Sequence, residues 1–161
     1  MNKENDVLDD GRDESANERA DRNWNELMQE LRVMQTGAQV LTGFLLAIAF
    51  QSRFPELDQG QVAAYVALVA LAALATILSI SPVVLHRVLF REGRKAQLVT
   101  YSSRIVSAEL VIIAMLTVGV TTFIIDVAVG LNAALVAFVI TTVVVLLLWV
   151  VTALFARKRR R

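Results

Sequence analysis

Glu109 is the ionisable residue that lies deepest within an apolar stretch of the sequence, in SSRIVSAELVIIAML. An acid in such surroundings is costly unless it is paired or hydrogen-bonded, so it is a candidate for proton or ion binding. Gln35 and Gln39 lie one helical turn apart in another apolar stretch. Amide side chains there form interhelical hydrogen bonds worth about 0.5–2 kcal/mol. These three residues are therefore the first candidates for a polar site.

A packing hypothesis joins these residues. Counted along each helix from its charged end, Glu109 lies about 7 Å inside, and Gly37 lies at a similar depth. A gap at Gly37 would admit Glu109. The carboxylate would then accept hydrogen bonds from Gln35 or Gln39 and pair with Arg32. Two roles stay open for this site, a structural contact between helices, which we favour, and a proton-binding or ion-binding site.

Other catalytic chemistry finds little support in the residue types. The sequence has no cysteine and one histidine, His86. It therefore offers no thiol nucleophile and no CxxC motif, and it shows no phosphate-binding loop and no cluster of acids with metal-ligand spacing. We predict that the protein is not an enzyme and needs no cofactor or metal. His86 stands beside Arg87 at an expected membrane boundary, and we interpret it as an interfacial residue.

The elements that position these residues are membrane spans. Hydrophobic residues make up 56% of the chain and charged residues 19%, with a mean hydropathy of +0.57. Four apolar stretches cover residues 33–54, 61–85, 105–125 and 131–155, and each reaches the ~20 residues that cross ~30 Å of hydrocarbon. The sequence therefore predicts an all-α integral membrane protein, a four-transmembrane-helix bundle at residues 33–155.

The basic residues predict the orientation of the bundle. They gather before the first span, in the second connection at 86–104 and in the tail, whereas the other two connections hold only Arg53. The positive-inside rule then places both termini in the cytoplasm of a bacterial inner (plasma) membrane. The tail at 156–161 is expected to anchor to lipid headgroups through its basic side chains, which are Arg157, Lys158, Arg159, Arg160 and Arg161.

An amphipathic helix precedes the first span without a break. Residues 1–14 are acidic and polar and are expected to be disordered. Ser15 and Glu18 have the spacing of a capping box, so a helix is expected over 15–32. Its apolar stripe consists of Trp24, Leu27, Met28 and Leu31. Three uses stay open for this stripe: contact with the lipid interface, contact with a membrane-protein partner through residues 15–34, and packing on the chain's own 86–104 segment.

Small residues recur at four-residue spacing in the spans, which lets helix backbones approach closely. The pairs are Gly43 with Ala47, Ala63 with Ala67, Ala75 with Ser79, and Ala133 with Ala137. This spacing predicts a tight bundle, with a homodimer or a larger oligomer as a candidate assembly in the lipid bilayer. Nucleic acid is not an expected partner, because a short basic tail without a folded reader makes only weak contacts.

Two blocks, DRNWNELMQELRVMQTGAQVLTGFLL and LATILSISPVVLHRVLFREGRKAQLV, carry a family resemblance together with the RFPEL segment between them. The chain resembles a family of short actinobacterial membrane proteins of unknown function, some of whose members carry the label of sodium:proton antiporter. The resemblance covers nearly all of the chain after the acidic tail. It implies a four-span membrane protein and carries over no catalytic residues. Typical cation/proton antiporters use paired intramembrane acids, whereas this sequence has one shallow acid.

Two functional hypotheses follow from the sequence. The favoured one is a non-catalytic bundle that acts through oligomerisation or as an accessory or scaffold subunit, with residues 15–34 as its docking element. The alternative is a proton-coupled cation or small-solute transporter that works as a dimer through Glu109, with Gln35 and Gln39 beside it.

Overall fold

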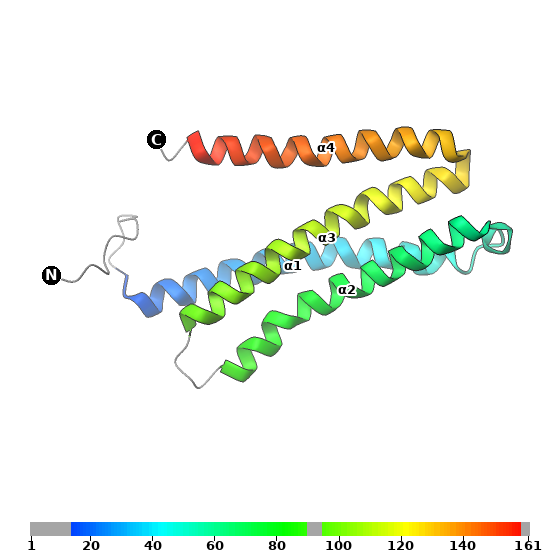
Figure 1. The fold of residues 1–161 in the computed structure, drawn as a ribbon. Coiled ribbons are helices and arrows are strands. Elements are labelled where there is room, and N and C mark those ends of the chain that lie inside the picture. Colours follow the sequence, from blue (N-terminus) through cyan, green and yellow to red (C-terminus); the bar gives the residue numbers. More distant parts are fainter. Residues whose placement is uncertain (1–13, 90–94, 159–161) are drawn as a thin grey trace.

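The computed structural model describes residues 14–89 and 95–158, and four long helices account for most of them (Figure 1). They are α1 at Ala16–Ile48, α2 at Gln59–Leu89, α3 at Lys95–Val129 and α4 at Leu131–Lys158. A short 3-10 helix, η1 at Phe54–Glu56, lies in the connection between α1 and α2. Each long helix has the length and apolar composition to cross a membrane, which confirms the predicted four-helix membrane architecture.

The helices run alternately up and down, so the bundle has two distinct ends. The start of α1, the end of α2, the start of α3 and the end of α4 lie at one end, which we call the basic end (Figure 1). The η1 connection and the α3–α4 turn lie at the opposite end. The amphipathic segment and the first span form the single helix α1, and this helix ends at Ile48 rather than at residue 54.

The core of the bundle lies between α1, α2 and α3, whose buried residues recur every seven positions. This repeat is typical of helices that cross at shallow angles with interlocking side chains, as in coiled coils and helix bundles. The buried heptad positions are Leu31, Ala38 and Leu45 on α1, Tyr65, Ala72 and Ser79 on α2, and Ser102, Glu109, Leu116 and Phe123 on α3.

Contacts at both ends fix the register between α1 and α2. At the basic end the rings of Trp24 and His86 stack with centroids 5.0 Å apart. Towards the opposite end, the Tyr65 hydroxyl donates a hydrogen bond to the carbonyl of Leu45 at 3.1 Å. Three heptads separate Trp24 from Leu45, and the same three separate Tyr65 from His86. The two antiparallel helices therefore stay in step along this whole length.

The register between α2 and α3 follows in the same way. Tyr65 packs near Phe123, with ring centroids 6.1 Å apart, and two heptads away Ser79 contacts Glu109. A further heptad step brings Ser102 level with His86. The core is thus a stack of layers, which from the basic end are Trp24–His86–Ser102, Leu31–Ser79–Glu109, Ala38–Ala72–Leu116 and Leu45–Tyr65–Phe123.

Helix α4 lies outside this three-helix core. It packs mainly against α3 and diverges from it towards the basic end (Figure 1). Only 6% of its most apolar stretch is buried in the protein, against 28% for α2. Gly130 joins α3 to α4 with φ +117°, a backbone conformation that side chains other than glycine rarely adopt. The chain therefore reverses direction within one residue.

Candidate functional site

Glu109 is fully buried, with 0% of its surface exposed, and it lies on the face of α3 that packs against α2. Its Oε1 forms a hydrogen bond with the hydroxyl of Ser79. The same hydroxyl lies 3.0 Å from the carbonyl oxygen of Ala75, one turn earlier in α2. The carboxyl group is therefore hydrogen-bonded to α2, and the prediction that it bonds to side chains of α1 is wrong.

The residues expected around Glu109 lie elsewhere on α1. Arg32 and Gln39 are exposed and Gln35 is half-buried. Gly37 is also exposed, and a Cβ atom built on it would meet no neighbour within 4 Å. The structure does not gather these four residues with Glu109. The physical reason is the helix register, because the heptad repeat places Leu31 at the level of Glu109.

Ser79 is the functional neighbour that sequence reasoning missed. Its small side chain marked it as a packing residue in the Ala75 and Ser79 pair, and both residues are indeed buried. Pro82 follows one turn later and is fully buried inside α2. Because proline has no backbone N–H, the helix hydrogen bond to the carbonyl of Leu78 is missing at this level. The available signal was the seven-residue spacing of Tyr65, Ala72 and Ser79, which places the serine on the buried face of α2.

Two polar atoms in this part of the core lack a partner. Among the described residues, neither Oε2 of Glu109 nor the hydroxyl of Ser102 has a hydrogen-bond partner, although both atoms are buried. Ser102 lies one heptad from Glu109 towards the basic end, about 10 Å along α3. Buried polar atoms are hydrogen-bonded in most proteins, so unpaired ones call for an explanation.

The stripe expected to dock a partner is used largely within the chain. Trp24 stacks on His86 with an interplanar angle of 19°, and Leu31 is 5% exposed in the core. Leu27 and Met28 are half-buried. The contact of Trp24 with His86 thus matches the third use considered for this stripe, which is packing on the chain's own 86–104 segment.

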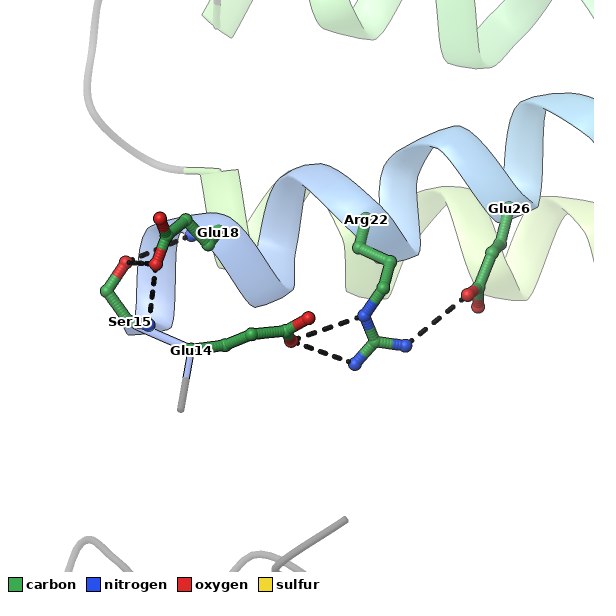
Figure 2. Close-up of polar contacts among 5 residues, drawn as sticks. All are labelled: Glu14, Ser15, Glu18, Arg22 and Glu26. Carbon is green, nitrogen blue, oxygen red and sulfur yellow. Dashed lines mark hydrogen bonds and ion pairs between the residues drawn. The ribbon is translucent and has the colours of Figure 1, made fainter. Parts of the chain in front are cut away.

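The start of α1 is held by its own polar side chains (Figure 2). The backbone N–H of Glu18 donates to Oγ of Ser15, and the Glu18 carboxylate accepts from the backbone N–H of Ser15, which confirms the capping box. The Ser15 hydroxyl also donates to the Glu18 carboxylate, and this bond first, then that from the Ser15 backbone N–H, lowers the pKa of Glu18. Arg22 bonds to Glu14 at 3.2 Å and to Glu26 at 3.3 Å, and its pKa is raised, chiefly by Glu14.

The two charged tails lie mostly outside the described residues. Lys158 is exposed at the end of α4. The side chain of Arg157 and the residues at 159–161 lie outside the described residues, as does the acidic segment 1–13. In the described part of the chain, no group of three or more His, Asp or Glu side chains could hold a metal ion.

An apolar groove of about 420 Å³ lies between α3 and α4. Its walls include Val111 and Met115 of α3 and Phe138, Thr142 and Trp149 of α4. The buried hydroxyl of Thr142 has no hydrogen-bond partner among the described residues. The groove lies where α4 departs from α3, so it faces the surroundings of the bundle rather than its core.

The comparisons with known proteins identify a family for this chain and add no activity. No curated protein and no solved structure matches the chain. One family model matches residues 13–153 of the chain. This segment contains all of α1, α2 and α3 and most of α4. The chain therefore belongs to DUF6328, a family of unknown function.

Proposed function

We propose that this protein is a non-catalytic helix bundle of the bacterial plasma membrane that works by associating with further membrane helices, first of all those of its own copies. Both termini lie in the cytoplasm. The support for this orientation is the distribution of basic residues, which leaves Arg53 alone at the opposite end of the bundle together with Glu56, Asp58 and Asp126.

The observation that carries the proposal is the position of α4. The other three helices close a core among themselves, whereas α4 shares a face with α3 only in part. Membrane helices associate through close packing and interhelical polar contacts, because lipid removes the hydrophobic drive to pair. The groove between α3 and α4 offers an apolar packing surface for such a helix.

Residues 15–34 take a smaller part in this proposal than the sequence suggested. Trp24 and Leu31 are occupied inside the chain. A membrane-protein partner would therefore meet the polar face of this segment, where Glu26 and Glu30 are exposed. Such a partner would act as an accessory contact beside the α4 face.

Cross-linking of single cysteines tests the association, because the chain has no cysteine of its own. Leu146→Cys places a thiol at the groove on α4, and Ile77→Cys places one on the outer surface of α2; the two native side chains are 54% and 62% exposed. In membranes treated with a short bismaleimide, we expect covalent dimers from Leu146→Cys and few from Ile77→Cys. Added lipid dilutes the protein and so reduces random collisions. Dimer yields that are equal in the two variants and fall together as lipid is added would rule out a specific α4 contact.

A second candidate function is a proton-coupled transporter of a cation or small solute, working as a dimer through Glu109. The observation in its favour is the fully buried carboxyl group. Proton and sodium flux in proteoliposomes under imposed gradients tests it. Flux that disappears in Glu109→Gln would support transport, and wild-type flux equal to that of empty liposomes would exclude it.

A further inference from the structure

The hydroxyl of Ser79 makes two contacts that share one hydrogen atom. It lies 3.0 Å from the carbonyl oxygen of Ala75, which can only accept, and it also bonds to Oε1 of Glu109. A serine hydroxyl has one proton to donate and lone pairs with which to accept. Both contacts can be separate, two-centre hydrogen bonds only if Glu109 carries a proton and donates it to Ser79 while Ser79 donates to Ala75; with a carboxylate, Ser79 would have to share its single proton between the two oxygens.

We infer that Glu109 is a proton-binding site in the folded protein, a carboxylic acid whose O–H group donates to Ser79 and whose exchange with water runs through the basic end of the bundle. The inference concerns where one proton resides. It depends neither on association through α4 nor on transport across the membrane.

The second oxygen of Glu109 supports the protonated form. Oε2 is buried and has no hydrogen-bond partner in the described chain. In a carboxylate both oxygens carry negative charge, and leaving one of them unpaired away from water is very costly. In a carboxylic acid the unpaired oxygen is a neutral carbonyl, for which the penalty is about 1–3 kcal/mol.

No neighbouring charge offers a substitute for this proton among the described residues. The charged or titratable groups nearest the level of Glu109 are Glu30 and Arg32 on α1, His86 and Arg87 on α2, and Arg104 on α3; all of them except His86, which is half-buried, are exposed. No ion pair links Glu109 to any of them. The apolar stretch 131–155 of α4 carries no charge at all.

The layers of the core make access to Glu109 one-sided. Towards the opposite end lies the buried layer of Leu116 with Ala38 and Ala72, followed by the buried layer of Leu45, Tyr65 and Phe123. Towards the basic end a single layer intervenes, and it contains the Ser102 hydroxyl and the stacked Trp24 and His86 rings. A proton leaving Glu109 therefore has a short, partly polar route to the basic end and a long apolar barrier on the other side.

Infrared spectroscopy of the full-length protein in lipid tests the protonation directly. At neutral pH we expect the carbonyl stretch of a protonated carboxylic acid in the wild type, absent from Glu109→Gln and retained in Asp126→Asn. In Ser79→Ala the band should shift, because the acid loses its acceptor. Absence of a Glu109 band at neutral pH would show a carboxylate and overturn the inference.

A second measurement needs no substitution. An apolar carbodiimide reacts with a carboxylic acid in a dry site. The O–H group of the acid adds across a C=N bond of the carbodiimide, and the resulting O-acylisourea rearranges to a stable N-acylurea. Mass spectrometry of the labelled wild type should locate this adduct on the peptide that contains Glu109. Labelling confined to carboxyl groups at the helix ends would contradict a protonated Glu109.

The route is tested by deuterium exchange of the Glu109 band. Trp24→Ala removes an aromatic ring from the basic end, and Phe54→Ala removes one that packs on the core at the opposite end. We expect several-fold faster exchange in Trp24→Ala and an unchanged rate in Phe54→Ala. Equal rates in the two variants, whether fast or slow, would refute access through the basic end.

Discussion

Tyr65 of α2 caps a backbone carbonyl near the end of another helix, α1. The last four carbonyls of a helix have no donor within that helix. One of these in α1, the carbonyl of Leu45, accepts a hydrogen bond from the Tyr65 hydroxyl of α2 at 3.1 Å in the buried core. The contact joins the end of α1 to α2 at a depth where water cannot replace the bond.

Removing this hydroxyl should destabilise the bundle. In Tyr65→Phe the Leu45 carbonyl stays buried without its donor, and we expect a loss of about 1–3 kcal/mol in the free energy of unfolding. Tyr101→Phe makes the same chemical change at a side chain that is 53% exposed and should have little effect. Thermal unfolding in detergent compares the two, and equal melting temperatures would contradict the role of this bond.

Ser15 and Glu18 link the start of α1 to pH. The folded pKa of Glu18 lies below its ordinary value of 4.5, first because of the hydrogen bond from the Ser15 side chain. The stabilisation is therefore fully present above pH 4.5 and is lost as the pH falls through the folded pKa. We expect amide exchange at the first turn of α1 to be slow at neutral pH and faster in acid.

Ser15→Ala should remove most of this pH dependence, because it takes away both the cap for the Glu18 N–H and the main bond to its carboxylate. Exchange at the first turn should then be fast at both pH values. Exchange in the middle of α1 serves as the internal control and should not change. A first turn that stays equally protected in Ser15→Ala would show that another contact holds it.

At the residue scale the sequence identifies the buried acid but not its surroundings. Glu109 stands out because no other charge lies so deep in a span. Its partner could not be found by counting depth from Arg32, since two helices that start on the same side need not be in step. The heptad spacing of Leu31, Ala38 and Leu45 contains the missing information, and it becomes decisive only when the faces of α2 and α3 are known.

Among the elements, the turn between α3 and α4 depends on one residue. Gly130 has φ +117°, and its N–H donates to the carbonyl of Ile125 at 3.3 Å. A side chain at this φ is strained even though a Cβ atom would meet no neighbour within 4 Å. The space around Gly130 would therefore allow a side chain, but the backbone angle disfavours one, and we expect the angle to determine the cost of a substitution.

Gly130→Ala should cost about 1–3 kcal/mol of stability, the usual range for a residue held in a disfavoured backbone conformation. Asn132→Ala is a suitable control two residues later, because that side chain is exposed in the first turn of α4. Thermal unfolding in detergent measures both. If Gly130→Ala matched the wild type, the α3–α4 turn would have to adopt another geometry.

The helix boundaries show which element properties the sequence carries. The four spans were predictable because each needs about 20 apolar residues. The helices are longer than the apolar stretches, however, with α3 starting at Lys95 rather than near residue 105. Hydropathy detects the part of a helix that lies in lipid, whereas polar stretches such as 95–104 continue the helix and have no apolar signal of their own.

The whole molecule has an orientation that chemical labelling can test. Asn17 and Lys158 lie at the basic end, which we propose faces the cytoplasm. We therefore expect thiols introduced by Asn17→Cys and Lys158→Cys to react with a membrane-impermeant maleimide only after cells are opened. Ser52→Cys and Asn132→Cys should react in intact cells. The reverse pattern would invert the topology, and reaction of all four in intact cells would rule out a bundle with two separate sides.

The number and direction of the spans follow from composition, but the arrangement of the four helices does not. The apolar content of α4 is the highest of the four, with a mean hydropathy of 3.0 in its most apolar stretch. Judged from sequence alone, such a helix could lie at the centre of a bundle as well as at its edge. Its place beside α3 depends on tertiary contacts that leave no periodic pattern in a helix surrounded mainly by lipid.

The register described for α1, α2 and α3 means that one core passes through two solvents. Helix α1 has 33 residues and α3 has 35, so each is roughly 50 Å long, while the hydrocarbon layer is ~30 Å thick. Because the start of α1 is polar and its apolar stretch begins near residue 33, we expect the Trp24 layer in or near water and the layers of Leu116 and Phe123 at the depth of the hydrocarbon. The same interlocking side chains are held by the hydrophobic effect at one end and by close packing alone at the other. We therefore expect temperature and dissolved salts to affect the packing of the Trp24 layer first, because this layer is nearest to water.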